Sequence, residues 1–113
     1  MSDHYRFGIV AGEKSGDILG ASLISALRNY FPNAEFIGVG GSEMVALGCE
    51  SLCPIDRLSV MGFVEPLRRL PELLTLKRKL RRRFLAERID AFIGIDSPVF
   101  NLSLAKALKS KGI

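Results

Sequence analysis

The chain has 113 residues, of which 48% are hydrophobic and 25% charged, as in an ordinary globular protein. This length favours a single domain, and no apolar run approaches the roughly 20 residues that a membrane-spanning helix needs. The first residues lack the basic, apolar and small-residue regions of a secretory signal. The sequence therefore predicts a cytoplasmic protein.

The positive charge gathers in one segment. Nine of the sixteen Lys and Arg residues lie between residues 68 and 88, against Glu72 and Glu87, so this segment carries +7 and the remainder −3. We expect one localised basic element on a mildly acidic body.

The cysteines do not indicate a metal site. Cys49 and Cys53 are spaced unlike CxxC redox or zinc pairs, and His4 is the only histidine. We expect two reduced, partly buried thiols, no metal and no cofactor.

Apolar runs alternate with helical patterns along the first half of the chain. The run at 7–11 predicts a buried strand. A helix is predicted from Asp17, which can cap its N-terminus, to the residues before Pro32. The next strand is predicted at 34–40, and Ser42 can cap a short helix after it.

The second half continues the alternation with less regular signals. A brief strand is predicted near 51–53, and a loop at 61–63. A long amphipathic helix should run from residue 65 or 71 to residue 87, because Pro71 can occupy a first turn or separate two helical pieces. Another strand is predicted at 91–96, and a last helix follows it.

This alternation predicts an α/β fold with a Rossmann-like, doubly wound parallel sheet. Ligands bind such sheets beyond the carboxyl ends of the strands, where the loops GEKSGD at 12–17 and DSPVFN at 96–101 should lie. Three or four strands make a narrow sheet with an open edge. We therefore expect residues 1–113 to be a single, incomplete domain, the first part of a larger one.

The loop at 12–17 contains glycines but is not a phosphate-binding loop. A Walker A loop needs Lys and Ser or Thr after its last glycine, whereas Asp17 follows Gly16. Glu13, Ser15 and Asp17 can accept hydrogen bonds from ligand hydroxyls. A tight turn in which Asp17 only caps the helix explains the same residues.

The loop at 96–101 offers a carboxylate at the tip of a strand. Asp96 can act as a general base or bind hydroxyls, and it can equally cap the next helix. Asn101 is a weaker candidate for substrate binding, because hydrogen bonding within the turn explains it as well.

Three interpretations fit the basic helix. Its leucines and Phe84 can pack in the core and leave a solvated basic face. It can also lie on an anionic membrane, where each nearby Lys or Arg contributes about 1 kcal/mol. Charge alone allows nucleic-acid binding, but stacking aromatics and recognised motifs are missing, so no nucleic-acid partner is predicted.

Five blocks follow one another along the chain: AGEKSGDILGASLISAL, FIGVGG, GCE, VMGFVEPLRRLPEL and IGIDSPVFN. Together they resemble the lipid-A-disaccharide synthase family over essentially the whole chain. The resemblance implies the N-terminal, acceptor-side portion of a two-domain GT-B glycosyltransferase, without its C-terminal nucleotide-sugar domain.

The resemblance also implies a reaction. Such an enzyme transfers a hexosyl group, with inversion, from UDP-2,3-diacylglucosamine to 2,3-diacylglucosamine 1-phosphate. The products are lipid A disaccharide 1-phosphate and UDP, and no metal is expected. The partners are then acylated glucosamine substrates, a UDP-sugar donor and the anionic cytoplasmic surface of the inner membrane of Gram-negative bacteria.

Residue roles follow from the matching motifs. Asp96 matches the family's essential aspartate, the general base, and Glu13, Ser15 and Asp17 match its acceptor-side loop. The family's membrane-docking surface matches Val64, Leu67, Arg68, Arg69, Leu70, Leu73 and Leu74.

The chain also departs from the family pattern. Lys14 stands where a small residue is expected, and Val99 stands where an acid is common. The alternative function is a non-catalytic Rossmann-like module that binds a nucleotide or a partner, with a basic helix for a membrane or nucleic acid.

Overall fold

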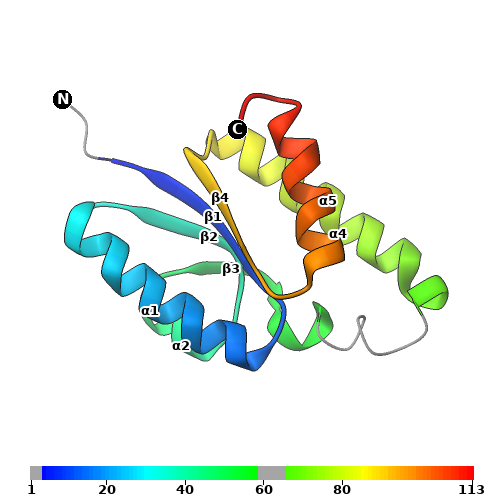
Figure 1. Cartoon of the computed structure of the whole chain (residues 1–113), viewed down its shortest axis with the longest axis horizontal. Coiled ribbons are helices and arrows are strands. Elements are labelled where there is room, and N and C mark those ends of the chain that lie inside the picture. Colours follow the sequence, from blue (N-terminus) through cyan, green and yellow to red (C-terminus); the bar gives the residue numbers. More distant parts are fainter. Residues whose placement is uncertain (1–3, 59–65) are drawn as a thin grey trace.

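A four-stranded parallel sheet in the order β3-β2-β1-β4 forms the centre of the computed structural model (Figure 1). The structure describes residues 4–58 and 66–113, and only the backbone of 66–70. The strands are β1 (Arg6–Ala11), β2 (Glu35–Gly40), β3 (Glu50–Pro54) and β4 (Ala91–Ile95). All four lie where the sequence predicts them, and the Rossmann-like α/β class is confirmed.

Helices cover both faces of the sheet, as the continuous apolar strands require. One face carries α1 (Lys14–Tyr30) and α2 (Ser42–Ala46), and the other carries α4 (Pro66–Glu87) and α5 (Pro98–Lys109) (Figure 1). Successive side chains of β1 lie on opposite faces of the sheet. Ile9 packs in the core under α1, and Val10 packs in the core under α4 and α5. A helical turn at 55–58 follows β3.

The basic helix α4 is continuous and begins at Pro66, so the earlier of its two predicted starts is correct. Proline fits the first helical position, because the N–H that it lacks would have no partner there. Pro71 lies inside the helix, near its N-terminal end. The loop predicted at 61–63 lies outside the described residues.

One side of α4 packs in the core. Leu76, Leu80 and Phe84 recur every four residues, and all three are buried. Gly8 of β1 makes room for this contact, because a Cβ at Gly8 would lie 3.0 Å from the Phe84 ring. The core-packing interpretation is therefore confirmed for this part of the helix, whose basic side chains Arg78, Lys79, Arg81 and Arg82 are exposed.

Two predicted helix caps are wrong. α1 begins at Lys14 with Glu13 at its N-cap position, so Asp17 lies in its first turn and does not cap it. α2 begins at Ser42 with Gly41 at its N-cap position, and Ser42 makes no cap hydrogen bond. Both predictions assumed that a helix is capped by its own residues, whereas the cap of α2 comes from another helix.

Both cysteines are free thiols, as predicted. Cys49 is buried, and desolvation raises the pKa of its thiol to about 12, so the thiol stays protonated near neutral pH. Burial also raises the pKa of Cys53, which is partly buried.

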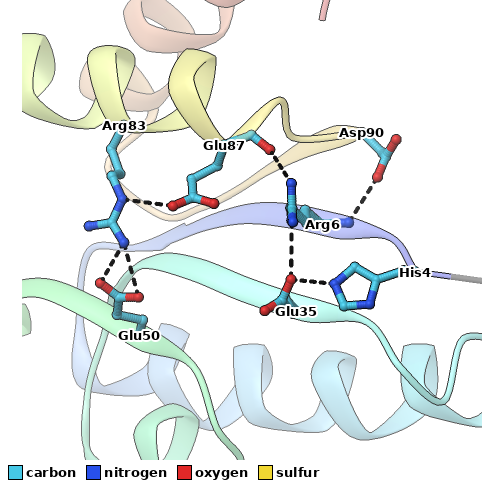
Figure 2. A network of polar contacts seen from close by, with 7 residues as sticks. All are labelled: His4, Arg6, Glu35, Glu50, Arg83, Glu87 and Asp90. Atoms are coloured by element: carbon cyan, nitrogen blue, oxygen red, sulfur yellow. Dashed lines mark hydrogen bonds and ion pairs between the residues drawn. The ribbon is translucent and has the colours of Figure 1, made fainter.

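Paired charges tie the amino ends of the strands to the end of α4 (Figure 2). The Arg6 guanidinium lies 3.1 Å from the Glu35 carboxylate and donates to the Glu87 carbonyl oxygen. Arg83 of α4 bridges Glu50 at 2.9 Å and Glu87 at 3.1 Å. The hydrogen bonds from His4 and Arg6 hold the pKa of Glu35 below its usual value. Each exposed ion pair alone contributes little to the free energy of unfolding, but the charges at the amino end of the sheet neutralise one another.

Candidate active site

The loops that follow β1 and β4 meet at the carboxyl end of the sheet. The Gly12 N–H donates to the Ile95 carbonyl oxygen at 3.1 Å. A Cβ at Gly12 would lie 2.0 Å from Ser97 Oγ, and one at Gly16 would lie 2.4 Å from Asp96 Oδ2. A Cβ at Gly12 would also lie 2.8 Å from the Ser97 Cβ, so the glycine there lets the two predicted loops pack together as one site.

The two loops belong to strands on opposite sides of the point where strand order reverses. From β1 the chain proceeds to β2 and β3 on one side, whereas β4 pairs with the other edge of β1. In open α/β sheets, ligands bind at this reversal, outside the carboxyl ends of the strands. The position of the loops therefore makes them the leading candidate for a binding site.

Asp96 projects from a strained turn. Its φ is 62° and that of Ser97 is 42°, so two successive residues other than glycine occupy the left-handed region. Such a residue costs about 1–3 kcal/mol and is concentrated at functional sites. Ser97, not Asp96, occupies the N-cap position of α5, so the structure does not support the helix-capping interpretation of Asp96.

The Asp96 side chain is exposed, and within residues 4–58 and 66–113 its carboxylate makes no hydrogen bond or ion pair. Glu13 and Ser15 are also exposed, and within the same ranges their side chains make no hydrogen bond. These three oxygen-bearing groups can meet a ligand at the carboxyl end of the sheet. The paired charges at its amino end are already engaged (Figure 2).

The two departures from the family pattern are also exposed. Lys14 begins α1, and Val99 lies in the first turn of α5 with 85% of its surface exposed. Neither residue obstructs the contact between the two loops.

Asp17, which the sequence also offers as a ligand contact, is engaged elsewhere. It is 5% exposed, and its Oδ1 accepts hydrogen bonds from the N–H groups of Gly41 and Met44, both at 2.9 Å. Its Oδ2 accepts one from the Glu43 N–H at 3.0 Å. Asp17 therefore caps α2 from α1 and holds the loop after β2. Gly41 makes room for this contact, because a Cβ there would lie 2.5 Å from Asp17 Oδ2.

Asn101 lies in the first turn of α5 and is 6% exposed. Its Nδ2 donates to the carbonyl oxygens of Asp96 at 2.7 Å, Val10 at 3.3 Å and Ile95 at 3.4 Å. Its Oδ1 is buried and has no hydrogen-bond partner in the described part of the chain. The interpretation that Asn101 bonds within the turn is confirmed for its amide nitrogen.

The predicted membrane-contact residues lie mostly outside the described side chains. Val64 belongs to the undescribed segment, and the side chains of Leu67, Arg68, Arg69 and Leu70 are not described. Leu73 is partly buried against the core, and Leu74 is 48% exposed.

Among the residues that the structure describes, no helix is long and apolar enough to cross a membrane. In the same ranges, no three His, Cys, Asp or Glu side chains gather to hold a metal ion.

Comparisons with known proteins point to one family. Residues 7–113 match the family described as lipid-A-disaccharide synthetase. Over 113 residues the chain is 58% identical to a lipid-A-disaccharide synthase of Cellvibrio japonicus and 56% identical to one of Saccharophagus degradans. It is 52% identical to one of Vibrio cholerae. The whole chain is covered each time, but it spans only about 30% of the relatives' length.

The three hydrogen bonds to Asp17 predict a large effect of its removal. Asp17→Ala leaves the N–H groups of Gly41, Glu43 and Met44 without their acceptor. We expect the free energy of unfolding to fall by about 2–3 kcal/mol, as for loss of a cap with unpaired buried donors. Urea unfolding measures the loss. Replacing the exposed Glu13 by Ala should change the free energy of unfolding by less than about 0.5 kcal/mol. Equal effects of the two substitutions would contradict the conclusion that Asp17 caps α2.

Proposed function

The chain belongs to the lipid-A-disaccharide synthetase family, and we propose that it forms the acceptor-side portion of an inverting GT-B glycosyltransferase. The observation that carries this proposal is the free Asp96 carboxylate at the reversal of strand order. The name shared by the matched relatives supports a glycosyltransferase that produces lipid A disaccharide.

The proposed reaction joins two acylated sugars. A hydroxyl oxygen of 2,3-diacylglucosamine 1-phosphate attacks the anomeric carbon of UDP-2,3-diacylglucosamine. The bond from that carbon to the UDP oxygen breaks, and configuration at the carbon inverts. The products are lipid A disaccharide 1-phosphate and UDP.

Asp96 is the general base in this proposal. Its exposed carboxylate has no partner in the described ranges, so it is free to accept the proton of the attacking hydroxyl. Its Oδ2 lies close to Gly16, in the first turn of α1. Attack and deprotonation thus take place where the two loops meet.

Glu13 and Ser15 are the acceptor-binding groups. Both are exposed in the loop that contacts Asp96, and both can accept hydrogen bonds from sugar hydroxyls. A carboxylate disfavours phosphate but suits hydroxyls, which accounts for an acid in a glycine-containing loop. Asp17 supports this surface indirectly, because its carboxylate is committed to α2.

The donor site would lie outside these 113 residues. Since the matched relatives are more than three times as long, we propose that a C-terminal nucleotide-sugar domain completes the cleft. The chain then forms a single, incomplete N-terminal domain whose loops face that second domain.

We also propose that α4 docks on the anionic cytoplasmic surface of the inner membrane. Leu74, Arg78 and Arg82 recur every four residues and are exposed. Each of them is two residues away in sequence from Leu76 or Leu80, which are buried. Two residues correspond to about half a helical turn, so the exposed residues lie on the opposite side of the helix.

The basic end of this face also carries a shallow groove. It has a volume of about 520 Å³ and is lined by Thr75, Arg78, Lys79, Arg82, Arg83 and Ala86. Leu74, followed along the helix by the exposed cations Arg78 and Arg82, suits an interface of acyl chains and anionic headgroups. Both proposed substrates carry acyl chains.

Replacing the base tests the mechanism. In a full-length synthase that contains this chain, Asp96→Asn should lower kcat by about 10²–10⁴-fold, because the amide cannot accept the proton. Steady-state transfer between the two purified substrates measures the loss. Asp56→Asn, an exposed acid after β3, is the matched control and should leave kcat within about twofold. Near-normal turnover of Asp96→Asn would remove Asp96 from the mechanism.

The 113 residues alone should transfer no hexosyl group, because the donor site is proposed to lie elsewhere. Product analysis after incubation with both substrates checks this, and disaccharide formation would refute the division of the site.

Titration of the same chain with UDP distinguishes the acceptor-side assignment from the alternative function, a nucleotide-binding module. Saturable binding would favour a nucleotide-binding module, and its absence agrees with the acceptor-side assignment.

Neutralising the exposed face of α4 tests membrane docking. Arg78→Gln with Arg82→Gln should weaken binding to phosphatidylglycerol vesicles by about thirtyfold at low salt, because each cation near the surface contributes about 1 kcal/mol. Vesicle sedimentation measures the change, with the exposed Lys111→Gln as control. Equal binding of the double variant and the control, or equal binding to uncharged phosphatidylcholine vesicles, would contradict this proposal.

A further inference from the structure

Asn101 donates hydrogen bonds to the turn that carries Asp96. Its Nδ2 donates to the Asp96 carbonyl oxygen at 2.7 Å, the shortest of its three hydrogen bonds. Its backbone N–H donates to the Ser97 carbonyl oxygen at 2.9 Å. One residue therefore binds the carbonyl groups of both left-handed residues.

The rest of Asn101 is anchored to the sheet. The same Nδ2 also donates to the carbonyl oxygens of Val10, the next-to-last residue of β1, and Ile95, the last residue of β4. Gly94 allows this close packing, because a Cβ there would lie 2.9 Å from the Asn101 Cβ. Asn101 thus joins the strained turn to two strands of the core.

Burial argues against a direct contact between Asn101 and a substrate. The residue is 6% exposed, its amide nitrogen is committed to three carbonyl groups, and its Oδ1 is buried. Of the three residues whose carbonyl oxygens accept from its Nδ2, Asp96 alone is exposed. Any influence of Asn101 on the reaction therefore passes through the position of Asp96.

We propose that Asn101 is a positioning residue that holds the Asp96–Ser97 turn in its left-handed conformation and so places the Asp96 carboxylate for proton transfer. This inference rests on the proposed function of Asp96. The left-handed region is unfavourable for residues other than glycine, and a hydrogen bond is worth about as much as the strain at one such residue. Loss of the bond should allow the turn to relax.

The test uses a full-length synthase that contains this chain. Asn101→Ala should lower kcat about tenfold to thirtyfold and leave KM within about twofold, because the substrate contacts remain while the base moves. In the Asn101→Ala background, Ser97→Gly should restore kcat at least about threefold, since glycine adopts positive φ without strain. Asn101→Ser, which is too short to reach the Asp96 carbonyl, provides a second variant if Asn101→Ala does not fold.

Leu104→Ala is the matched control for a merely structural role. Leu104 lies on the same helix and is buried, so its truncation destabilises the domain without touching the turn. Its kcat should stay within about twofold of the wild type, measured where all variants remain folded. A raised KM at unchanged kcat in Asn101→Ala, an unchanged kcat, or a failure of Ser97→Gly to restore it would each overturn the proposal.

A crystal structure of Asn101→Ala separates this inference from the proposed function. We expect the φ angles of Asp96 and Ser97 to leave the positive region, and positive angles in the variant would overturn the positioning role. Absence of hexosyl transfer by the wild-type protein would instead refute the proposed function, whatever the geometry of the turn.

Discussion

The close contact between the loops after β1 and β4 is the constraint on which the candidate site depends. At Gly12 a methyl group would collide with the Ser97 side chain, and at Gly16 it would displace the end of the Asp96 side chain, so the two glycines let the start of α1 approach the end of β4. The contact brings Glu13, Ser15 and Asp96 to one end of the sheet. It also explains why a loop with two glycines need not bind phosphate, since here the glycines admit protein atoms.

Charged groups have different roles at the two ends of the sheet. At the amino end, Arg6, Glu35, Glu87 and their neighbours pair with one another and link three strands to α4 (Figure 2). At the carboxyl end, Asp96 and Glu13 have no such partners among the described residues. Exposed ion pairs contribute little to the free energy of unfolding. An unpaired carboxylate in a strained turn, by contrast, is available to react with or bind a ligand.

Two polar residues of the candidate site bind other parts of the protein, and this limits what they can do for a substrate. The carboxylate of Asp17 receives three backbone N–H groups, and Asn101 donates to three carbonyl groups. A motif of polar residues therefore divides into exposed groups that can meet a ligand and buried groups that hold them.

The sequence predicted the order of strands and helices and the buried run of each strand, because both depend on local hydrophobic periodicity. It also predicted where both polar loops lie, because the carboxyl ends of parallel strands meet at the same edge of a sheet. The motifs also indicated the family, which the comparisons show. The partner of Asp17, the conformation of Asp96 and the burial of Asn101 could not be predicted. Each depends on contacts between elements distant in the chain, so by itself the sequence determined which residues reach the carboxyl end of the sheet, and only the tertiary structure decided which of them remain free to bind a ligand.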